Sequence, residues 1–220
     1  MAGIDRDFKI TLGLEKKGHP QVGKPINGTK VSDNLQDIES CDCLIDFSQA
    51  QATLELLPYL VKYKKCAVVG TTVLDSIQQA AVMAAAKKIP VVFSPNMSVG
   101  VNLLFKLVQM SGEILKNYNV RIEEAHHIHK KDSPSGTAKK IVQLLNEEGF
   151  SIKIEDIQAI RKNEIVGDHK IIFESKGDKI EIFHTAKTRD IFAEGALLAA
   201  KWIKGKKPGL YSMEDVLSLK

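Results

Sequence analysis

The chain has 220 residues, of which 44% are hydrophobic and 26% are charged, a composition typical of a globular protein with one or two domains. Its 31 basic and 27 acidic residues are mixed along the sequence and give a formal charge of +4, which does not support binding to nucleic acid or to a membrane surface. Anionic small molecules remain as partners. Three cysteines, two of them only two positions apart, form no disulfide framework, and we interpret them as reduced, buried and inert.

The start of the sequence does not show the basic and apolar regions of a secretory signal. No apolar run reaches the length of a membrane span. We therefore expect a cytoplasmic protein.

The first half of the chain alternates short, apolar, β-branched segments with segments of helical spacing. Ser48 is the predicted N-cap of the first helix, and Pro58 is expected to kink that helix or to begin a new first turn. This alternation is typical of a parallel sheet covered by helices on both faces, so we predict a doubly wound nucleotide-binding domain. The predicted strands are 8–15, 43–47, 66–70 and 90–94, and the predicted helices are 49–63 and 74–88.

After Gly100 the pattern changes to strands that follow one another without intervening helices, which indicates a second, α+β domain. Lys176-Gly177-Asp178 is a hairpin signal. A last helix begins at Asp190 and is ended by Pro208-Gly209. The other predicted elements are helices at 101–117 and from about Thr137, and strands at 120–126, 154–160, 169–175 and 179–185.

Two polar loops follow predicted parallel strands, where open α/β sheets place their ligands. They are Gly70-Thr71-Thr72 and the run from Ser94 to Gly100. Both can offer backbone N–H groups and hydroxyls to a nicotinamide or a phosphate, although composition alone favours ordinary turns. Glu15 can accept hydrogen bonds from a ribose diol and Lys16-Lys17 can meet a 2′-phosphate, yet such charges are more often solvated surface.

A dinucleotide-binding domain normally opens with a strand, a glycine-rich loop and a helix that together grip the pyrophosphate. Nothing before Phe8 can supply this unit, and the segment MAGIDRD resembles the end of a helix that leads into the second strand. Because the first strand is central in such a sheet, its loss would leave a gap in the middle of the sheet or force the neighbouring strands into new pairings. We therefore expect the sequence to be truncated, or to begin at an internal methionine.

The segment EEAHHIHKKDSPSGTAKK, residues 123–140, gathers three histidines, basic residues and a helix start. A metal site is disfavoured because the neighbouring lysines repel a dication. Lys130 and the helix start at Ser135-Gly136-Thr137 can instead hold a dicarboxylate, and His126 can donate a proton near neutral pH. A basic surface loop whose Ser135 or Thr137 merely caps a helix explains the same residues equally well.

The run from Glu124 to Ala138 closely resembles the signature of the 4-hydroxy-tetrahydrodipicolinate reductase (dihydrodipicolinate reductase) family. The resemblance covers essentially the whole chain, because five further segments look like family segments in family order. These are 44–48, 69–72, 96–102, 184–186 and 208–213.

The resemblance implies reduction of the cyclic dicarboxylate 4-hydroxy-tetrahydrodipicolinate to tetrahydrodipicolinate by NADH or NADPH, in the diaminopimelate route of lysine biosynthesis. It implies a Rossmann-like, N-terminally truncated nucleotide-binding domain made of residues 1–97 and 190–220. Residues 98–189 would form an α+β substrate-binding domain, whose open mixed sheet assembles a homotetramer.

The resemblance also implies roles for single residues. His126 would be the catalytic proton donor or acceptor and Lys130 a second proton donor. No metal is expected. The substrate carboxylates would be held by His127, Ser135, Gly136 and Thr137, and the cofactor by Glu15 at the ribose, Lys16 at a 2′-phosphate, and Gly70, Thr71, Thr72, Ser94, Pro95, Asn96 and Met97 on the nicotinamide side.

The chain departs from the family pattern in two places. Ile128 stands where family members carry a basic residue, which lowers the expected charge of the loop. The glycine-rich loop is absent, which puts cofactor binding in doubt. Two hypotheses remain: an active reductase whose first ~20–25 residues are missing, or a catalytically impaired protein that binds dicarboxylates or serves in assembly.

Overall fold

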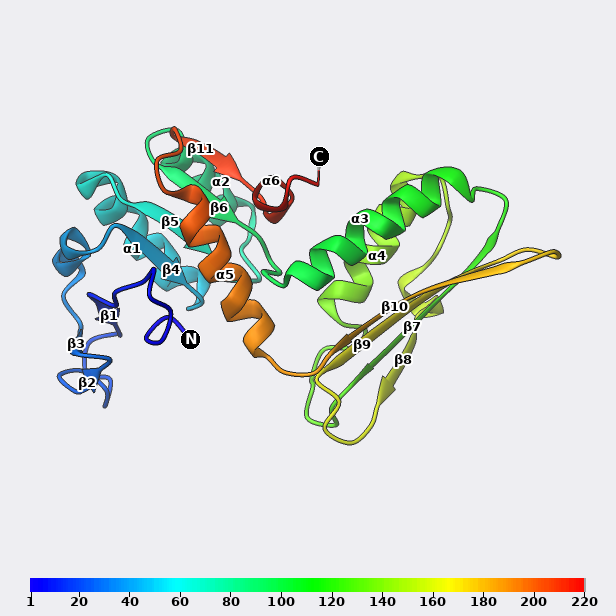
Figure 1. The fold of residues 1–220 in the computed structure, drawn as a ribbon, viewed down its shortest axis with the longest axis horizontal. Coiled ribbons are helices and arrows are strands. Elements are labelled where there is room, and N and C mark those ends of the chain that lie inside the picture. The colour runs from blue at the N-terminus through cyan, green and yellow to red at the C-terminus, as the bar shows by residue number, and fades with distance from the viewer. Residues whose placement is uncertain (220) are drawn as a thin grey trace. The chain divides into compact units, whose positions relative to one another are not determined.

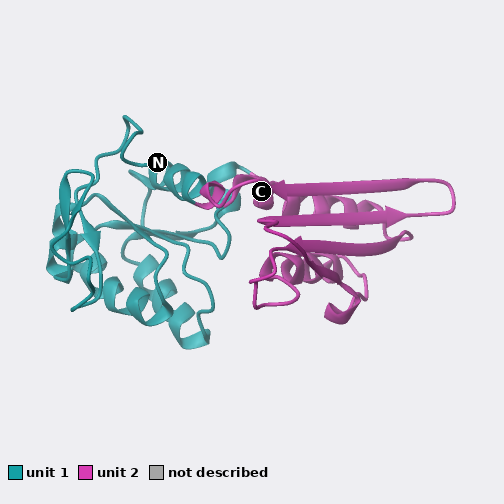
Figure 2. Cartoon of the chain, turned by 90° about the horizontal axis from the view of Figure 1, so that it is seen from below, with its two compact units in different colours: residues 1–97, 193–218, 220 teal, residues 98–192, 219 magenta. Residues whose placement is uncertain are grey.

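The computed structural model of the chain describes residues 1–219. These residues form two compact units, shown in different colours in Figure 2. Unit 1 comprises residues 1–97 and 193–218, and unit 2 comprises residues 98–192. The chain therefore leaves unit 1 after Met97 and returns to it within a helix that begins at Asp190.

Unit 1 contains a parallel sheet of order β11-β6-β5-β4 with helices on both faces (Figure 1). The alternation of strands and helices in the sequence predicts this arrangement, and the predicted α/β fold class is confirmed. Its strands are β4 (Cys43–Asp46), β5 (Cys66–Val69), β6 (Pro90–Phe93) and β11 (Gly209–Tyr211). Its helices are α1 (Ala50–Tyr63), α2 (Ser76–Ala86), α5 (Asp190–Ile203) and α6 (Met213–Leu217).

Alternate residues of each strand pack on opposite sides of this sheet, which divides the core of unit 1 in two. Ala67 and Val69 pack with the buried residues of α1 and α2. Val68 and Val92 pack with those of α5 and α6. Because the central strands are covered on both faces, they are apolar along their whole length.

A second, small sheet of order β1-β3-β2 precedes the parallel sheet. It contains β1 (Gly13–Leu14), β2 (Pro25–Ile26) and β3 (Thr29–Ser32), and a 3₁₀ helix η1 (Leu35–Ser40) follows it. β1 pairs only with β3, and β4 pairs only with β5. Within the described residues, β1 and β4 are therefore edge strands of two separate sheets.

Unit 2 is a four-stranded mixed sheet of order β10-β9-β7-β8, with two helices packed on one face (Figure 1). β7 runs parallel to β8 and antiparallel to β9, which also pairs antiparallel with β10. The strands are β7 (Asn119–His126), β8 (Gln158–Arg161), β9 (Gly167–Glu174) and β10 (Lys179–Ala186). The helices are α3 (Val99–Ile114) and α4 (Gly136–Glu147), with a 3₁₀ turn η2 (Ile154–Asp156).

The structure corrects two local predictions. The strand expected over 8–15 is reduced to Gly13–Leu14, because only these residues have a partner strand. Ser48 does not cap α1; Gln49 is the N-cap, and the Ser48 N–H instead donates to Asp46. The sequence signals also missed the short strands β2, β3 and β11, whose few residues carry little periodicity.

Candidate active site

The polar residues of unit 2 gather on the face of the sheet that α3 and α4 cover. Glu124 on β7 lies beside His169 on β9, which lies beside His184 on β10. His126 is two residues further along β7 and lies beside Arg161 on β8. Successive residues of a strand point to opposite faces, so this register brings four elements together at one end of the covered face.

Glu124 is the hub of this cluster. Its side chain is 1% exposed, and one carboxylate oxygen makes a short hydrogen bond with Nδ1 of His126. The other oxygen accepts hydrogen bonds from Arg161 Nη2 at 2.8 Å and from the backbone N–H of Ser135 at 3.3 Å. Burial would raise the pKa of Glu124, but the hydrogen bonds from His126 and Arg161 outweigh burial and lower it. The hub is therefore a carboxylate.

His126 is 7% exposed and is held by its Nδ1 atom, which leaves Nε2 as the nitrogen that a ligand can reach. Gly167 on β9 lies against this nitrogen: a side chain added there would place its Cβ 3.0 Å from Nε2. Any larger residue at position 167 would therefore crowd His126. The carboxylate at Nδ1 and the glycine beside Nε2 fix the position of the ring.

His169 connects the sheet to the start of α4. Its Nε2 lies 3.2 Å from Oγ of Ser135, the N-cap of α4, and the same Oγ accepts a hydrogen bond from the N–H of Ala138. The Ser135 hydroxyl and the His169 ring thus share a hydrogen bond. Burial, followed by the positive charge of His126, lowers the pKa of His169 to about 3, so the ring is neutral. Nδ1 of His169 is buried without a partner among the described residues.

The N-terminus of α4 is open at Gly136, the first residue of the helix. A Cβ added at Gly136 would meet no atom within 4 Å, whereas Ser135 beside it is 2% exposed. Helix N-termini present backbone N–H groups and a partial positive charge to anions. The structure therefore brings a candidate anion site, on Gly136 and Thr137, next to the residues that bond to Glu124.

Lys130 lies in the loop between β7 and α4. Its Nζ makes an ion pair with Oδ1 of Asp132 at 2.7 Å, and the Asp132 backbone oxygen accepts a hydrogen bond from Arg161 at 2.7 Å. Burial would raise the pKa of Asp132, but the hydrogen bond from Lys130 outweighs burial and lowers it. The amine is thus held beside the cluster by a carboxylate that a bound anion would have to replace.

The other two histidines of the loop stand apart from the hub. His127 and His129 have ring centroids 6.1 Å apart, and His129 lies 3.7 Å from a carboxylate oxygen of Glu164. The side chain of His129 is 72% exposed. Among the described residues, the His127 ring lies beside that of His129.

One group of possible metal ligands occurs among the described residues: Glu124, His126 and His169, with ligand atoms within 4.8 Å of one another. Both oxygens of Glu124 already accept hydrogen bonds, one of them from the cationic Arg161. A dication would have to displace that guanidinium and the imidazole. We therefore interpret the group as a hydrogen-bonded cluster.

The predicted cofactor residues of unit 1 fall into two sets. Those of the first set are buried and have structural partners. Thr71 Oγ1 lies 3.1 Å from Oγ1 of Thr53, which donates to Asp46 at 2.5 Å, and Ser94 Oγ donates to the backbone oxygen of Asn96 at 2.8 Å. Met97 is 1% exposed.

The second set of cofactor residues reaches the surface. Thr72 and Pro95 are exposed, and Glu15 directly follows β1, with its carboxylate 3.8 Å from His19 Nδ1 and Lys16 exposed beside it. The carboxylate suits a ribose diol, the amine suits a phosphate, and the hydroxyl suits an amide. The phenyl ring of Phe47 lies so close to Gly70 that a Cβ there would be 2.4 Å from it. A larger residue at position 70 would therefore displace the exposed Phe47 ring.

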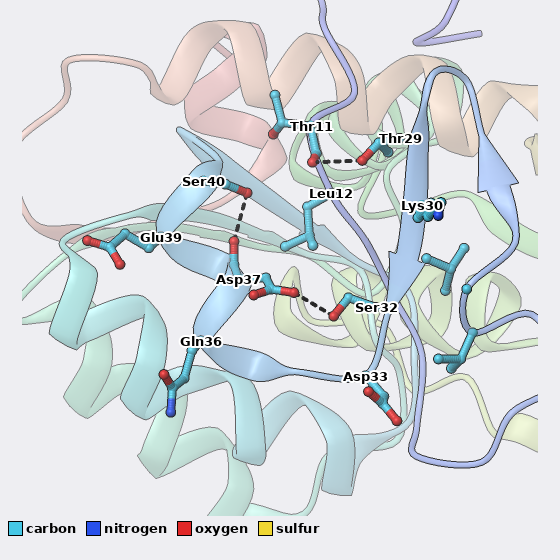
Figure 3. A pocket seen from close by; sticks show the side chains of 13 residues that line it. Thr11, Leu12, Thr29, Lys30, Ser32, Asp33, Gln36, Asp37, Glu39 and Ser40 are labelled. Atoms are coloured by element: carbon cyan, nitrogen blue, oxygen red, sulfur yellow. Dashed lines mark hydrogen bonds between the residues drawn. The ribbon is translucent and has the colours of Figure 1, made fainter.

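A surface depression lies elsewhere in unit 1 (Figure 3). It has a volume of about 670 Å³ and lies between β3, η1 and the segment before β1. Asp37 is bonded to Ser32 in its wall, and Asp33 and Glu39 add further carboxylates (Figure 3). The depression contains none of the predicted site residues, and its negative charge disfavours an anionic ligand.

Sequence reasoning missed Arg161 and His169, and it quoted Glu124 without giving it a role. They come from β8, β9 and β7, and only the strand register brings them together. A signal was present in residues 167–174, where a histidine interrupts a buried strand. Buried histidines need a hydrogen-bond partner, so His169 could have been singled out as polar and buried.

Comparison with known proteins identifies relatives along the whole chain. Residues 1–97 match the family described as "Dihydrodipicolinate reductase, N-terminus" and residues 100–217 match "Dihydrodipicolinate reductase, C-terminus". A protein of Trichlorobacter lovleyi named 4-hydroxy-tetrahydrodipicolinate reductase is 39% identical over 248 aligned residues, which cover 100% of this chain and 93% of the relative. One of the same name from Thiobacillus denitrificans is 41% identical, with coverages of 98% and 91%.

Solved structures share the fold. The dipicolinate-bound dihydrodipicolinate reductase of Paenisporosarcina sp. TG-14 superposes with a TM-score of 0.82 at 20% identity, covering 97% of this chain and 91% of the other. An amine dehydrogenase of Mycobacterium smegmatis superposes with a TM-score of 0.55 at 11% identity, with coverages of 92% and 87%. In the described residues, no helix combines the length and the apolar character needed to cross a membrane.

Proposed function

The chain belongs to the dihydrodipicolinate reductase family, and on that premise we propose which of its residues bind the substrate, move the proton and hold the cofactor. It is an NAD(P)H-dependent oxidoreductase of the diaminopimelate route of lysine biosynthesis, acting on 4-hydroxy-tetrahydrodipicolinate. The alternative, a dicarboxylate-binding or assembly protein without activity, has no finding in its favour. We assign substrate binding to residues 98–189 and cofactor binding to residues 1–97 and 190–220.

One observation carries the assignment of the active site. Glu124 bonds both to His126, the candidate proton donor, and to the backbone of Ser135, which begins the candidate anion site. A substrate carboxylate bound at Gly136 and Thr137 would therefore lie at a fixed place relative to the imidazole. Holding a reacting group and a catalytic group in fixed geometry is a major source of rate enhancement.

His126 moves the proton in this proposal. Glu124 accepts a hydrogen bond from Nδ1 of His126, so Nε2 faces the substrate and delivers the proton to it. The carboxylate also stabilises the positive charge of the imidazolium before it gives up its proton. Arg161 holds Glu124 in place through the second oxygen.

Lys130 is the second cation of the substrate site. Its ion pair with Asp132 keeps the amine extended near the cluster, and a substrate carboxylate would exchange with Asp132 as its partner. The same amine can supply a second proton. His127 contributes to the rim of the site, since it lies in the same loop and is half-buried.

The cofactor, NADPH or NADH, supplies a hydride when it is bound. Glu15 and Lys16 would hold its adenosine end, because a carboxylate suits the ribose diol and an amine suits a 2′-phosphate. Gly70, Thr72, Pro95 and Asn96 would line its nicotinamide end. Thr71, Ser94 and Met97 would act indirectly, by shaping the two loops from beneath.

We also propose a cytoplasmic homotetramer that assembles through the open face of the unit 2 sheet. Phe183 on β10 is 60% exposed and Ile160 on β8 is 38% exposed, and the register places both on the face opposite α3 and α4. Lys170 and Glu181 form an ion pair on the same face. Multi-angle light scattering tests this proposal, and a monomer at micromolar concentration would contradict it.

The substrate site is tested by calorimetric titration of pyridine-2,6-dicarboxylate, a flat dicarboxylate, in the presence of NADPH and then of NADH. We expect Gly136→Val to weaken binding of the dicarboxylate at least about tenfold, because the added methyl groups fill the open space beside the helix start. Gly177→Val, at an exposed hairpin glycine, is the matched control and should leave affinity unchanged. Equal affinities of the two variants would contradict the proposed anion site.

A further inference from the structure

Two cysteines that are far apart in the sequence lie side by side in the sheet of unit 1. Cys43 is the first residue of β4, Cys66 is the first residue of β5, and the two are direct register partners. Neighbouring strands are about 4.8 Å apart, which falls within the Cα separation of about 4.4–6.8 Å found in disulfides. Both side chains pack with Val68 and Val92, so they are on the same face of the sheet.

The two thiols are close enough for each to shift the pKa of the other. Cys43 is the main cause that lowers the pKa of Cys66, and Cys66 is the main cause that raises the pKa of Cys43. The Cys43 sulfur also lies 3.9 Å from the backbone oxygen of Leu44. The positive charge of Lys204 also favours the Cys66 thiolate, whereas burial and Asp42 oppose it. Cys66 is therefore the nucleophile of the pair, and Cys43 is the neighbouring thiol.

Cys43 and Cys66 are only partly buried, so a small oxidant can reach them. The Cys66 thiol donates a hydrogen bond to the backbone oxygen of Asp42 at 3.3 Å, at the exposed end of the two strands, and it gives up this bond when it is deprotonated. β4 is an edge strand of its sheet, which allows it to move slightly toward β5 when a bond forms. The third cysteine, Cys41, is 7% exposed, packs in the core under α1 and bonds to the backbone oxygen of Ile38 at 3.2 Å.

We propose that Cys43 and Cys66 form a peroxide-responsive thiol pair, which a hydroperoxide converts into a reversible disulfide between β4 and β5. The site is separate from the residues assigned to substrate and cofactor, and it does not depend on those assignments. It also revises the interpretation of the three cysteines as inert, because that interpretation rested on sequence spacing and could not include the strand register.

The chemistry takes two steps. The Cys66 thiolate attacks one oxygen of the hydroperoxide, so that an S–O bond forms and the O–O bond breaks. The other part of the peroxide leaves as an alkoxide or hydroxide, which takes up a proton. Cys66 sulfur is oxidised by two electrons to a sulfenic acid. The Cys43 sulfur then attacks the sulfenic sulfur, the S–O bond breaks, and the hydroxyl leaves as water with the Cys43 proton. A dithiol reverses the product to two thiols.

The experiment uses the intact chain treated with hydrogen peroxide in slight excess. We expect the free thiols to fall from three to one per chain, and the intact mass to fall by the two hydrogen atoms of one disulfide. Peptide mapping should find the disulfide between Cys43 and Cys66, and dithiothreitol should restore all three thiols. Loss of all three thiols at one rate, a disulfide that includes Cys41, or disulfide-linked dimers would overturn the proposal.

Two variants separate the steps. In Cys43→Ser the oxidised Cys66 has no neighbouring thiol, so we expect a sulfenic acid that dimedone traps, instead of a disulfide. Cys41→Ser is the matched control, since it removes a thiol of the other core and should form the Cys43–Cys66 disulfide at the rate of the unchanged chain. A slowed reaction in Cys41→Ser, or no dimedone adduct in Cys43→Ser, would show that Cys66 is not the attacking thiol.

Discussion

The two units place their polar residues in different ways. In unit 2 the candidate proton donor His126 is itself buried, and one buried carboxylate, Glu124, connects it to a neighbouring strand and to a helix start. In unit 1 the buried polar residues, such as Thr71 and Ser94, support loops whose exposed neighbours face the solvent. Buried polar residues therefore form the candidate site itself in unit 2, whereas in unit 1 they support the candidate cofactor loops from beneath.

The sharpest test of this contrast is the replacement of His126 by glutamine. If His126 delivers the proton, turnover should fall by about 10²–10⁴-fold, the usual contribution of a general acid. Affinity for pyridine-2,6-dicarboxylate should stay within the same order of magnitude, since the carboxylates bind elsewhere. His129→Gln, on the exposed part of the same loop, is the control and should leave turnover unchanged. Equal losses of turnover and affinity would show that His126 only binds.

Replacing Glu124 by glutamine tests the hub itself. His126 loses the carboxylate that fixes its ring, so we expect turnover to fall by about 10–100-fold. Arg161 loses its partner as well, and the free energy of unfolding should fall by about 1–3 kcal/mol. Steady-state kinetics and urea unfolding measure the two effects.

The control for the Glu124 experiment is Glu174→Gln, which removes another arginine partner from the same sheet. The Arg121–Glu174 pair is exposed, so its loss should cost less than about 1 kcal/mol and leave turnover unchanged. If both variants lost turnover to the same extent, the hub would have no special part in the reaction.

A third test uses pH. The pKa of His169 is about 3 in the folded chain and about 6.5 in an unfolded one, so the unfolded state takes up the proton first as pH falls. Between pH 6.5 and 3 this residue therefore reduces the free energy of unfolding, by up to about 1.4 kcal/mol per pH unit. His169→Gln should lose stability less steeply than the unchanged chain between pH 6.5 and 5. Parallel curves from urea unfolding would contradict the burial of a neutral ring.

The smallest expected effect is in unit 1, where Thr71 and Thr72 are neighbours with opposite exposure. Thr71→Val removes the buried hydroxyl next to Thr53 and should cost about 1 kcal/mol of unfolding free energy. Thr72→Val should leave stability unchanged and weaken NADPH binding. Thermal unfolding and NADPH titration measure both effects on both variants. Weaker NADPH binding only in Thr71→Val, with a loss of stability only in Thr72→Val, would contradict the roles given to the two residues.

Local patterns in the sequence predict much of this fold. The helix start at Ser135 follows from a capping residue before a helical pattern, and strands β4, β5 and β6 follow from apolar runs between turns. Register cannot be obtained in this way. Arg161 and His169 meet Glu124 only because β8 and β9 both pair with β7, and nothing local to either residue specifies that alignment.

The short strand at Gly13–Leu14 also shows that local sequence does not determine which residues find a partner strand. Residues 8–12 have the composition of a strand, yet the structure forms one only where β3 provides a partner. Likewise, Ser48 is a good N-cap by type, but Asp46 binds its N–H and the helix begins two residues later. Propensity gives the candidates, and long-range contacts select among them.

The two edge strands of unit 1, β1 and β4, have a consequence for the behaviour of the protein in solution. In the described residues, β4 pairs on one side only, and β1 does so too, which leaves two rows of amide and carbonyl groups without strand partners. Such rows act as templates for strands of other molecules, and natural sheets usually shield them. Concentrated samples should therefore be prone to aggregate by edge-to-edge pairing of strands, and we expect β4 to be the first strand to pair in this way.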